Sequence, residues 1–350
     1  MRSFACTNCT NIVYFENTSC LKCNHPVGFH ETSMSMVTLE KDPSAPGLFR
    51  ICKSRDKSVM RYCSNAPQGA CNWLTPSDDP NTLCLACDLN RTIPNLSEFG
   101  NLKAWTDLER AKKRLVYSLL RFELPLDTRP KPPGRLTFDF AHNAKTGHLD
   151  GVISIDLRET DAVERERQRQ YFGESYRTLL GHLRHESGHF YWSMLVGGAG
   201  RLDAFRALFG DENTSYADAM DRHHAQGAPA NWQTQYVSAY ATAHPWEDWA
   251  ETWAHYLHMT AAVDTAESAG MEPRAAGIIF GSIWPFKKSD IYREATFEGL
   301  MDRWIPLTIA MNRMSRSMGH SDFYPFVIPA LAYDKLAFIH EAIRDAPRKR

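Results

Sequence analysis

The sequence predicts an α+β protein, with small β-rich modules at the N-terminus followed by a mostly helical domain that includes a small sheet. Three observations predict this fold class. The first hundred residues contain all nine cysteines, several of them in C-x-x-C pairs, and few long apolar runs. Later segments carry apolar residues at helical spacing over several turns. Two short segments between these regions alternate apolar and polar residues, as half-buried strands do.

Composition limits the classes of protein to consider. A chain of 350 residues with 43% hydrophobic content can bury a large core, and we expect more than one domain. The net charge of −1 gives no global attraction to nucleic acid or to a membrane. We expect no membrane span and no secretory signal, because there is no long apolar run and no apolar stretch after the first Met. An odd number of cysteines, some in C-x-x-C pairs, favours metal thiolates in a reducing compartment, and therefore the cytoplasm.

Residues 1–30 form the first predicted module. Cys6, Cys9, Cys20 and Cys23 follow the spacing C-x2-C-x10-C-x2-C. Two pairs of thiolates supply the tetrahedral ligand set of a structural Zn²⁺. The alternative, a redox C-x-x-C, usually needs only one pair at the start of a helix. We therefore expect a zinc ribbon.

Residues 31–95 form a second predicted zinc-ribbon module, but they contain one cysteine too many for a single site. We assign four of the five to a second structural zinc, because the chain after Cys71 runs through a turn to the last C-x-x-C pair. These four are Cys63, Cys71, Cys84 and Cys87. Cys52 is then a lone thiol. The spacing of Cys63 and Cys71 is irregular for a ribbon, so an arrangement in which Cys52 replaces one of them stays open.

The two modules have balanced charge. Residues 1–100 contain nine Lys and Arg and nine Asp and Glu. A nucleic-acid reader would carry a basic surface. We therefore expect the ribbons to contact a protein partner or a substrate rather than DNA or RNA.

Residues 96–134 are expected to form a helix and a Pro-rich linker. Apolar residues recur at helical spacing over residues 101–122. The other face carries Arg110, Lys112, Lys113 and Arg114, which we interpret as a solvated face; the alternative is a site for an anionic partner. Three prolines between Asp127 and Gly134 predict a stiff connection, and we place the domain boundary there.

The last predicted domain spans residues 135–350 and begins with two strands. Residues 136–140 and 152–157 alternate apolar and polar side chains, and the turn-rich segment between them predicts a hairpin. A sheet edge near a metal site can hold an extended peptide by main-chain hydrogen bonds, although the sequence does not say which strand would do so. Residues 159–170 are highly charged and are expected to be an exposed helix or loop.

The H-E-x-x-H pattern His185-Glu186-Ser187-Gly188-His189 lies within residues 181–192. Helical residues four apart lie on one face, about 6 Å apart along the axis, so both imidazoles can bind one Zn²⁺. Glu186 lies beside that face, where it can take a proton from water. Five residues alone are a weak signal, but an apolar helical stripe, a cap at Ser175 and the end at Gly197-Gly198 support a buried helix.

A catalytic zinc needs a third protein ligand and an open position. The metzincin pattern would require Gly and His where the chain has Trp192 and Leu195, so it is excluded. Residues 240–258 fit the gluzincin pattern, in which a later helix supplies a Glu. We assign Glu247 as the ligand and Glu251 as the acceptor of a ligand imidazole N–H, because buried carboxylates need such partners.

Other interpretations of this helix stay open. The roles of Glu247 and Glu251 can be exchanged, or the segment can be an amphipathic helix whose glutamates form ion pairs. We interpret His182 and His244 as surface or capping residues, with hydrogen-bond donors to the substrate as the alternative. We interpret His255 and His258 as packing residues or hydrogen-bond partners of the ligands rather than as ligands.

Considered with these residues, the chain resembles the bacterial family of zinc-binding metallopeptidases that carry N-terminal zinc ribbons. The resemblance extends over nearly the whole chain. It rests on long strings: CNWL at 71–74, LNRTIP at 89–94, YRTLLGH at 176–182, HESGHFYW at 185–192, the segment 245–258, and NRMSRSMG at 312–319. It implies a gluzincin-like fold for residues 135–350 and peptidase activity, but it supplies no substrate.

The segment from Tyr240 to Glu251 is also similar to lethal-factor-type gluzincins, in which a Tyr stands seven residues before the ligand Glu. Tyr240 stands seven before Glu247. The resemblance implies that the Tyr240 phenol hydrogen-bonds the oxyanion that forms during hydrolysis.

We therefore expect a zinc-dependent peptidase with one catalytic zinc, two structural zincs and Glu186 as general base. Its partners would be a peptide or protein substrate and a protein bound by the ribbons, with no membrane or nucleic acid. The alternative function is a non-catalytic, zinc-stabilised protein-binding module.

Overall fold

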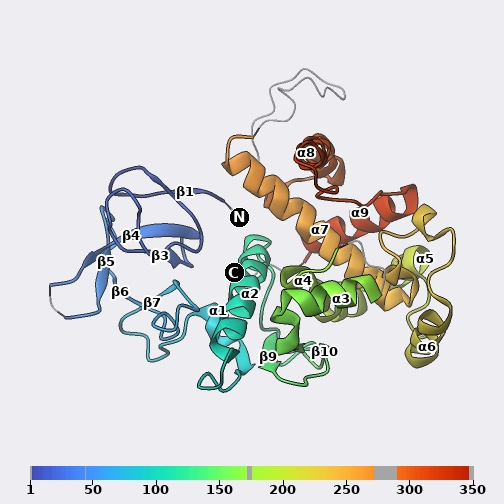
Figure 1. Cartoon of the computed structure of the whole chain (residues 1–350), viewed down its shortest axis with the longest axis horizontal. Helices are drawn as coiled ribbons and strands as arrows, with labels where there is room; N and C mark the ends of the chain where they lie inside the picture. Colours follow the sequence, from blue (N-terminus) through green and yellow to red (C-terminus); the bar gives the residue numbers. More distant parts are fainter. Residues whose placement is uncertain (1, 44, 172–175, 272–289, 347–350) are drawn as a thin grey trace. The chain divides into compact units, whose positions relative to one another are not determined.

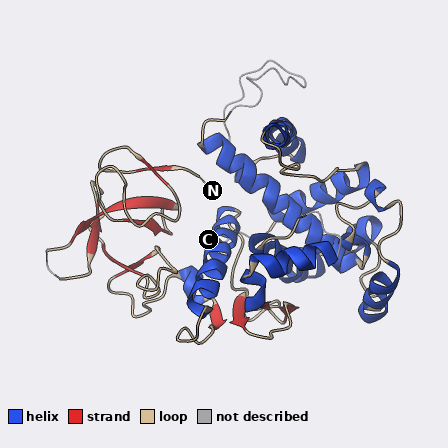
Figure 2. Ribbon diagram, viewed as in Figure 1, coloured by secondary structure: helices blue, strands red, loops and turns tan. Residues whose placement is uncertain are grey.

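The computed structural model describes residues 2–43, 45–171, 176–271 and 290–346 (Figures 1 and 2). Contacts divide the chain into two compact units. The first consists of Met1–Tyr117, Thr137–Thr146 and Ser154–Asp161, and the second of Ser118–Leu136, Gly147–Ile153 and Ala162–Arg350. The N-terminal region is rich in strands and the C-terminal part is mostly helical, so the α+β prediction is confirmed.

The first unit contains two antiparallel sheets. Strand β1 (Phe4–Ala5) pairs with β2 (Ile12–Val13). A five-stranded sheet has its strands in sequence order: β3 (Val27–His30), β4 (Ser35–Lys41), β5 (Phe49–Ile51), β6 (Val59–Tyr62) and β7 (Leu74–Pro76). One face buries Val37, Leu39, Met60 and Leu74, which form a small apolar cluster.

A separate cluster of aromatic side chains packs helix α2 (Asn101–Arg121) against these sheets within the first unit. The ring centroids of Phe29 and Trp73 lie 4.5 Å apart, and those of Phe15 and Tyr117 lie 5.4 Å apart. The helix predicted at residues 101–122 is confirmed. The interpretation of its polar face as solvated was wrong for Lys112 and Lys113, which are buried, whereas the side chains of Arg110 and Arg114 are 50% and 40% exposed.

Several short elements follow the five-stranded sheet in the sequence. Helix α1 (Leu85–Asp88) is followed by β8 (Asn90–Thr92), which pairs in parallel with β9 (Thr137–Ala141). Strand β11 (Val152–Asp156) lies beside β9, so the two predicted strands are confirmed as neighbours. The connection between them is more than a turn, because it contains strand β10 (Gly147–Leu149), which lies beside β11 at one end of the strand order.

The second unit is built from helices (Figure 1). The highly charged segment forms the exposed helix α3 (Ala162–Tyr171). It is followed by α4 (Leu179–Trp192), a π-helical turn (Ser193–Gly197), α5 (Leu202–Phe209), α6 (Tyr216–Gln226), a 3₁₀ turn (Tyr240–Thr242), α7 (Pro245–Ser268), α8 (Phe297–Ser317) and α9 (Ala330–Arg344). Of the helices in the described ranges, none has the length and apolar character needed to cross a membrane.

Helices α4 and α7 pack against each other at the H-E-x-x-H motif. A Cβ atom on Gly188 would lie 3.0 Å from the Cα of Ala250, so a larger residue would have to push the two helices slightly apart. The indole of Trp249 donates to the Gly188 carbonyl oxygen at 2.8 Å, and that of Trp253 donates to the Ser187 hydroxyl at 3.0 Å. These bonds fix the relative position of the two helices that carry the predicted ligands.

Local capping explains where these helices begin. The Thr178 hydroxyl caps α4 by accepting from the Gly181 N–H. Ser175, the cap expected from the sequence, lies outside the described residues. Helix α7 begins with Pro245 in its first turn, as expected, and the His244 ring accepts from the Trp246 N–H at 3.0 Å.

Candidate metal centres and active site

The first thiolate cluster contains Cys6, Cys9, Cys20 and Cys23. The sulfur atoms of Cys6 and Cys23 lie 3.6 Å apart, as do those of Cys9 and Cys20. A tetrahedral site with Zn–S bonds of about 2.3 Å separates its sulfurs by about 3.8 Å, whereas a disulfide bond is about 2.05 Å long. The four thiols therefore fit a metal ion, and none is in a disulfide.

The second thiolate cluster brings together Cys63, Cys71, Cys84 and Cys87. The sulfurs of Cys71 and Cys84 lie 3.6 Å apart. Backbone N–H groups are directed at two of the sulfurs: that of Cys84 at Cys63 and that of Trp73 at Cys71. Such donors stabilise thiolates. Cys52 is buried outside the cluster, where burial and Glu40 raise the pKa of its thiol to about 11.

A buried charge triad, Glu109, Lys112 and Lys113, lies beside the second cluster. Lys113 Nζ donates to Glu109 Oε2 and to the Ala70 carbonyl oxygen, each at 2.7 Å, and Lys112 Nζ donates to Glu109 Oε1 at 2.6 Å. Burial would lower the pKa of Lys113, but Glu109 and the neighbouring thiols of Cys71, Cys87 and Cys84 raise it. Four thiolates around Zn²⁺ carry a net charge of −2, which the triad's net charge of +1 partly offsets.

The third cluster consists of His185, His189 and Glu247, whose ligand atoms lie within 4.8 Å of one another. His185 Nε2 is 2.9 Å from Glu247 Oε2, and His189 Nε2 is 3.5 Å from Glu247 Oε1. Ligands about 2.0–2.1 Å from a tetrahedral Zn²⁺ are separated by about 3.3 Å. The donor set and its spacing therefore fit zinc. The structure brings together the three residues that the sequence indicated as ligands.

Glu251 orients one of these imidazoles. His185 Nδ1 donates to Glu251 Oε1 at 2.7 Å, which leaves Nε2 facing Glu247. The Ser238 hydroxyl donates to Glu251 Oε2 at 2.6 Å. Burial would raise the pKa of Glu251, but these hydrogen bonds and the charge of His185 lower it, so Glu251 is an acceptor at neutral pH.

Glu186 is buried beside the third cluster without being part of it. Its Oε1 lies 3.2 Å from His182 Nε2. Burial would raise the pKa of Glu186, but the hydrogen bond from His182 and the fields of His185 and His189 lower it. Glu186 is therefore a carboxylate that can accept a proton near the metal position.

Two tyrosines lie at the third cluster. The ring centroids of Tyr240 and His185 are 5.9 Å apart, and burial together with Glu247 raises the pKa of Tyr240, so its phenol stays protonated. Tyr216 was not anticipated from the sequence. Its hydroxyl donates to Glu247 Oε1 at 2.8 Å. No local pattern marks Tyr216, because it reaches the site from α6, a helix with no motif of its own.

His148 on β10 is a second residue that sequence reasoning missed. Its ring stacks near that of His189, with centroids 6.4 Å apart, and its Nε2 accepts from the Gly151 N–H at 3.2 Å. Burial and the neighbouring His189 lower the pKa of His148 to about 4. A neutral imidazole on a strand therefore lies beside the ligand helix.

The other histidines have structural partners. His244 caps α7, His255 Nδ1 is 2.6 Å from the Tyr324 hydroxyl, and His258 hydrogen-bonds Arg184. None of them belongs to the metal clusters of the described residues.

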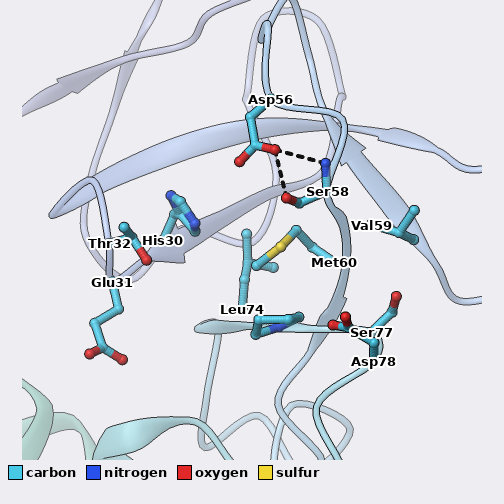
Figure 3. A pocket seen from close by; sticks show the side chains of 11 residues that line it. His30, Glu31, Thr32, Asp56, Ser58, Val59, Met60, Leu74, Ser77 and Asp78 are labelled. Atoms are coloured by element: carbon cyan, nitrogen blue, oxygen red, sulfur yellow. Dashed lines mark hydrogen bonds between the residues drawn. The ribbon is translucent and has the colours of Figure 1, made fainter.

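A separate cavity of about 400 Å³ lies on the five-stranded sheet of the first unit (Figure 3). Met60 and Leu74 form apolar parts of its wall. Asp56 at its rim accepts hydrogen bonds from the backbone and hydroxyl of Ser58. The cavity contains none of the metal-cluster residues.

Two cysteine clusters followed by a His-His-Glu cluster on packed helices define a zinc-binding protein of the ribbon-bearing metallopeptidase class. Residues 101–342 match the family model described as "Putative zinc-binding metallo-peptidase", and residues 3–98 match a zinc-ribbon domain. The chain belongs to this metallopeptidase family.

Uncharacterized proteins from Mycobacterium bovis and Mycobacterium tuberculosis are similar to the chain along its length. They are 39% identical over 349 residues, covering 98% of this chain and 95% of each relative. No solved structure matches the chain.

Proposed function

We propose that this protein is a zinc-dependent peptidase that hydrolyses peptide bonds at the His185, His189 and Glu247 cluster. The observation that carries the proposal is the combination of this three-residue donor set with a further buried acidic group, Glu186, that is not needed as a ligand. A purely structural zinc site is usually closed by four protein ligands, whereas a catalytic site keeps one position open.

Three side chains have separate roles in the proposed hydrolysis: Glu186, Tyr240 and Glu251. Bound zinc would polarise the scissile carbonyl and lower the pKa of a water molecule. Glu186 accepts the proton of the attacking water and then returns it to the leaving amine. Tyr240, held neutral by its surroundings, donates to the developing oxyanion. Glu251 keeps the His185 ring in the orientation that presents Nε2.

Strand β10 is the proposed substrate-binding edge. It ends the strand order of its sheet and contacts α4 within the second unit. An extended peptide can add to such an edge through main-chain hydrogen bonds. His148, in the middle of β10, would bring the peptide beside His189. We infer that unfolded or extended protein segments are the substrates.

The proposed zinc content is three ions per chain, one in each cysteine cluster and one in the His-His-Glu cluster. Elemental analysis of purified protein tests this number. A content of two, with both cysteine clusters filled, would favour the non-catalytic, protein-binding alternative.

The activity is tested with Glu186→Gln. The substitution keeps the size of the side chain but removes the base, so hydrolysis of denatured casein should fall by about 10²–10⁴-fold while three zincs remain bound. Glu166→Gln, on the exposed helix α3, is the matched control and should retain wild-type activity. Wild-type rates in the Glu186→Gln variant would refute the proposed mechanism.

A further inference from the structure

The two carboxylate oxygens of Glu247 have different partners. Oε2 lies 2.9 Å from His185 Nε2 and has no hydrogen bond from Tyr216. Oε1 accepts a hydrogen bond from the Tyr216 hydroxyl at 2.8 Å and lies 3.5 Å from His189 Nε2. Glu247 is only 2% exposed, so an oxygen that does not bind metal needs a donor from the protein.

We propose that Tyr216 is a positioning residue for the catalytic zinc. Its hydroxyl holds Glu247 Oε1 and thereby presents Oε2 to the ion, so that the carboxylate binds through one oxygen and a coordination position stays open. This inference rests on the proposed function, because it assumes that zinc binds at this cluster. A ligand carboxylate that is itself hydrogen-bonded is pre-oriented, which raises metal affinity.

The segment that carries Tyr216 is attached to the start of α7. Tyr216 is the first residue of α6, and the Ser215 hydroxyl caps that helix by accepting from the Asp218 N–H. The preceding residue, Thr214, is linked through its hydroxyl and its carbonyl oxygen to His244 Nε2, each at 3.1 Å. His244 is also the cap of α7, three residues before Glu247. His244 therefore helps to position both the Tyr216 hydroxyl and the Glu247 carboxylate that accepts from it.

The ring of Tyr216 also packs against residues around the ligands. Its centroid lies 5.2 Å from that of His244 and 6.2 Å from that of Trp246, and Trp246 in turn lies 4.4 Å from the ligand His189. The residue is nevertheless 43% exposed, so it is not a core residue on which folding depends. Removing only its hydroxyl should leave the fold intact.

Tyr216 and Tyr240 therefore have different roles. The Tyr216 hydroxyl donates a hydrogen bond to the ligand carboxylate, whereas the ring of Tyr240 lies beside that of His185, with centroids 5.9 Å apart and planes inclined by 49°. Loss of the Tyr216 hydroxyl should weaken zinc binding, and excess zinc should restore hydrolysis. Loss of the Tyr240 hydroxyl should lower the rate even when zinc is saturating.

The test is Tyr216→Phe in the full chain, with zinc affinity at the third site measured by competition with a chromophoric chelator. The dissociation constant should rise about 10–100-fold, while the two cysteine-bound zincs and the far-UV circular dichroism spectrum stay unchanged. Tyr333→Phe on α9, which carries no ligand, is the control and should bind zinc as the wild type does.

The outcomes separate this inference from the proposed function. An unchanged dissociation constant in Tyr216→Phe, with three zincs in the wild type, would overturn the role of Tyr216 and leave the peptidase proposal standing. Activity that stays lost at saturating zinc would also overturn it, because the phenol would then act on the substrate. A wild-type protein with no third zinc would overturn both.

Discussion

Replacing Lys113 with Met tests whether the buried charge triad supports the second thiolate cluster. The Lys113 ammonium makes two hydrogen bonds of 2.7 Å, to Glu109 and to the Ala70 carbonyl oxygen, and its residue is 4% exposed. Met keeps an unbranched side chain of similar length but leaves Glu109 with one fewer cation and the Ala70 carbonyl without this donor. Removing one partner of a buried ion pair costs about 3–5 kcal/mol.

The expected size of the effect can be expressed as a shift in urea midpoint. A loss of about 4 kcal/mol reduces the folding equilibrium constant roughly a thousandfold. With a urea dependence of about 2 kcal/mol per molar, the midpoint for the first unit should fall by about 2 M. The loss should be accompanied by zinc release, because the cation no longer offsets the charge of the thiolates.

The assay follows tryptophan fluorescence and zinc release together during urea titration. Lys103→Met is the matched control, because Lys103 is on the same helix but its ion pair with Asp107 is exposed. The control should shift the midpoint far less. A Lys113→Met protein with the wild-type midpoint and wild-type zinc retention would refute the proposed support.

Three further substitutions test the third cluster. Tyr240→Phe should lower hydrolysis by about 10²–10³-fold with the zinc content unchanged, and steady-state kinetics showing the wild-type rate would contradict its assignment to the oxyanion. Glu251→Gln removes the carboxylate acceptor of His185 and should weaken zinc binding about 10–100-fold; chelator competition giving an equal affinity would rule this out. Gly188→Ala pushes against Ala250 and should cost about 1–3 kcal/mol, so an unchanged thermal melting curve would show that the contact can relax.

The ligand helix and the cysteine clusters illustrate what local spacing can predict. Residues four apart on a helix share a face whatever the rest of the fold does, so His185 and His189 could be paired from the sequence. The helix containing Glu247 was also predicted, because Pro245 marks its start, although the helix extends beyond residue 258 to Ser268.

Burial of charged residues was not predictable in the same way. Lys112 and Lys113 were interpreted as a solvated face, since lysine is rarely buried. The sequence does contain one signal of these ion pairs, because Glu109 stands three residues before Lys112 and four before Lys113. That spacing is also common on exposed helices. Only the contacts with other elements, such as the hydrogen bond from Lys113 to the Ala70 carbonyl oxygen, show that the two lysines are buried.

The sequence by itself determined the α+β class, the helix at residues 101–122, the helix within residues 240–258, and the candidate ligands that lie in short motifs. The tertiary structure decided which groups surround those ligands: Tyr216 from α6, His148 from β10 and Ser238 beside Glu251. The physical reason is the range of the interactions. Helical periodicity and chelating pairs act over a few residues, whereas a hydrogen bond between distant segments leaves no pattern in either one.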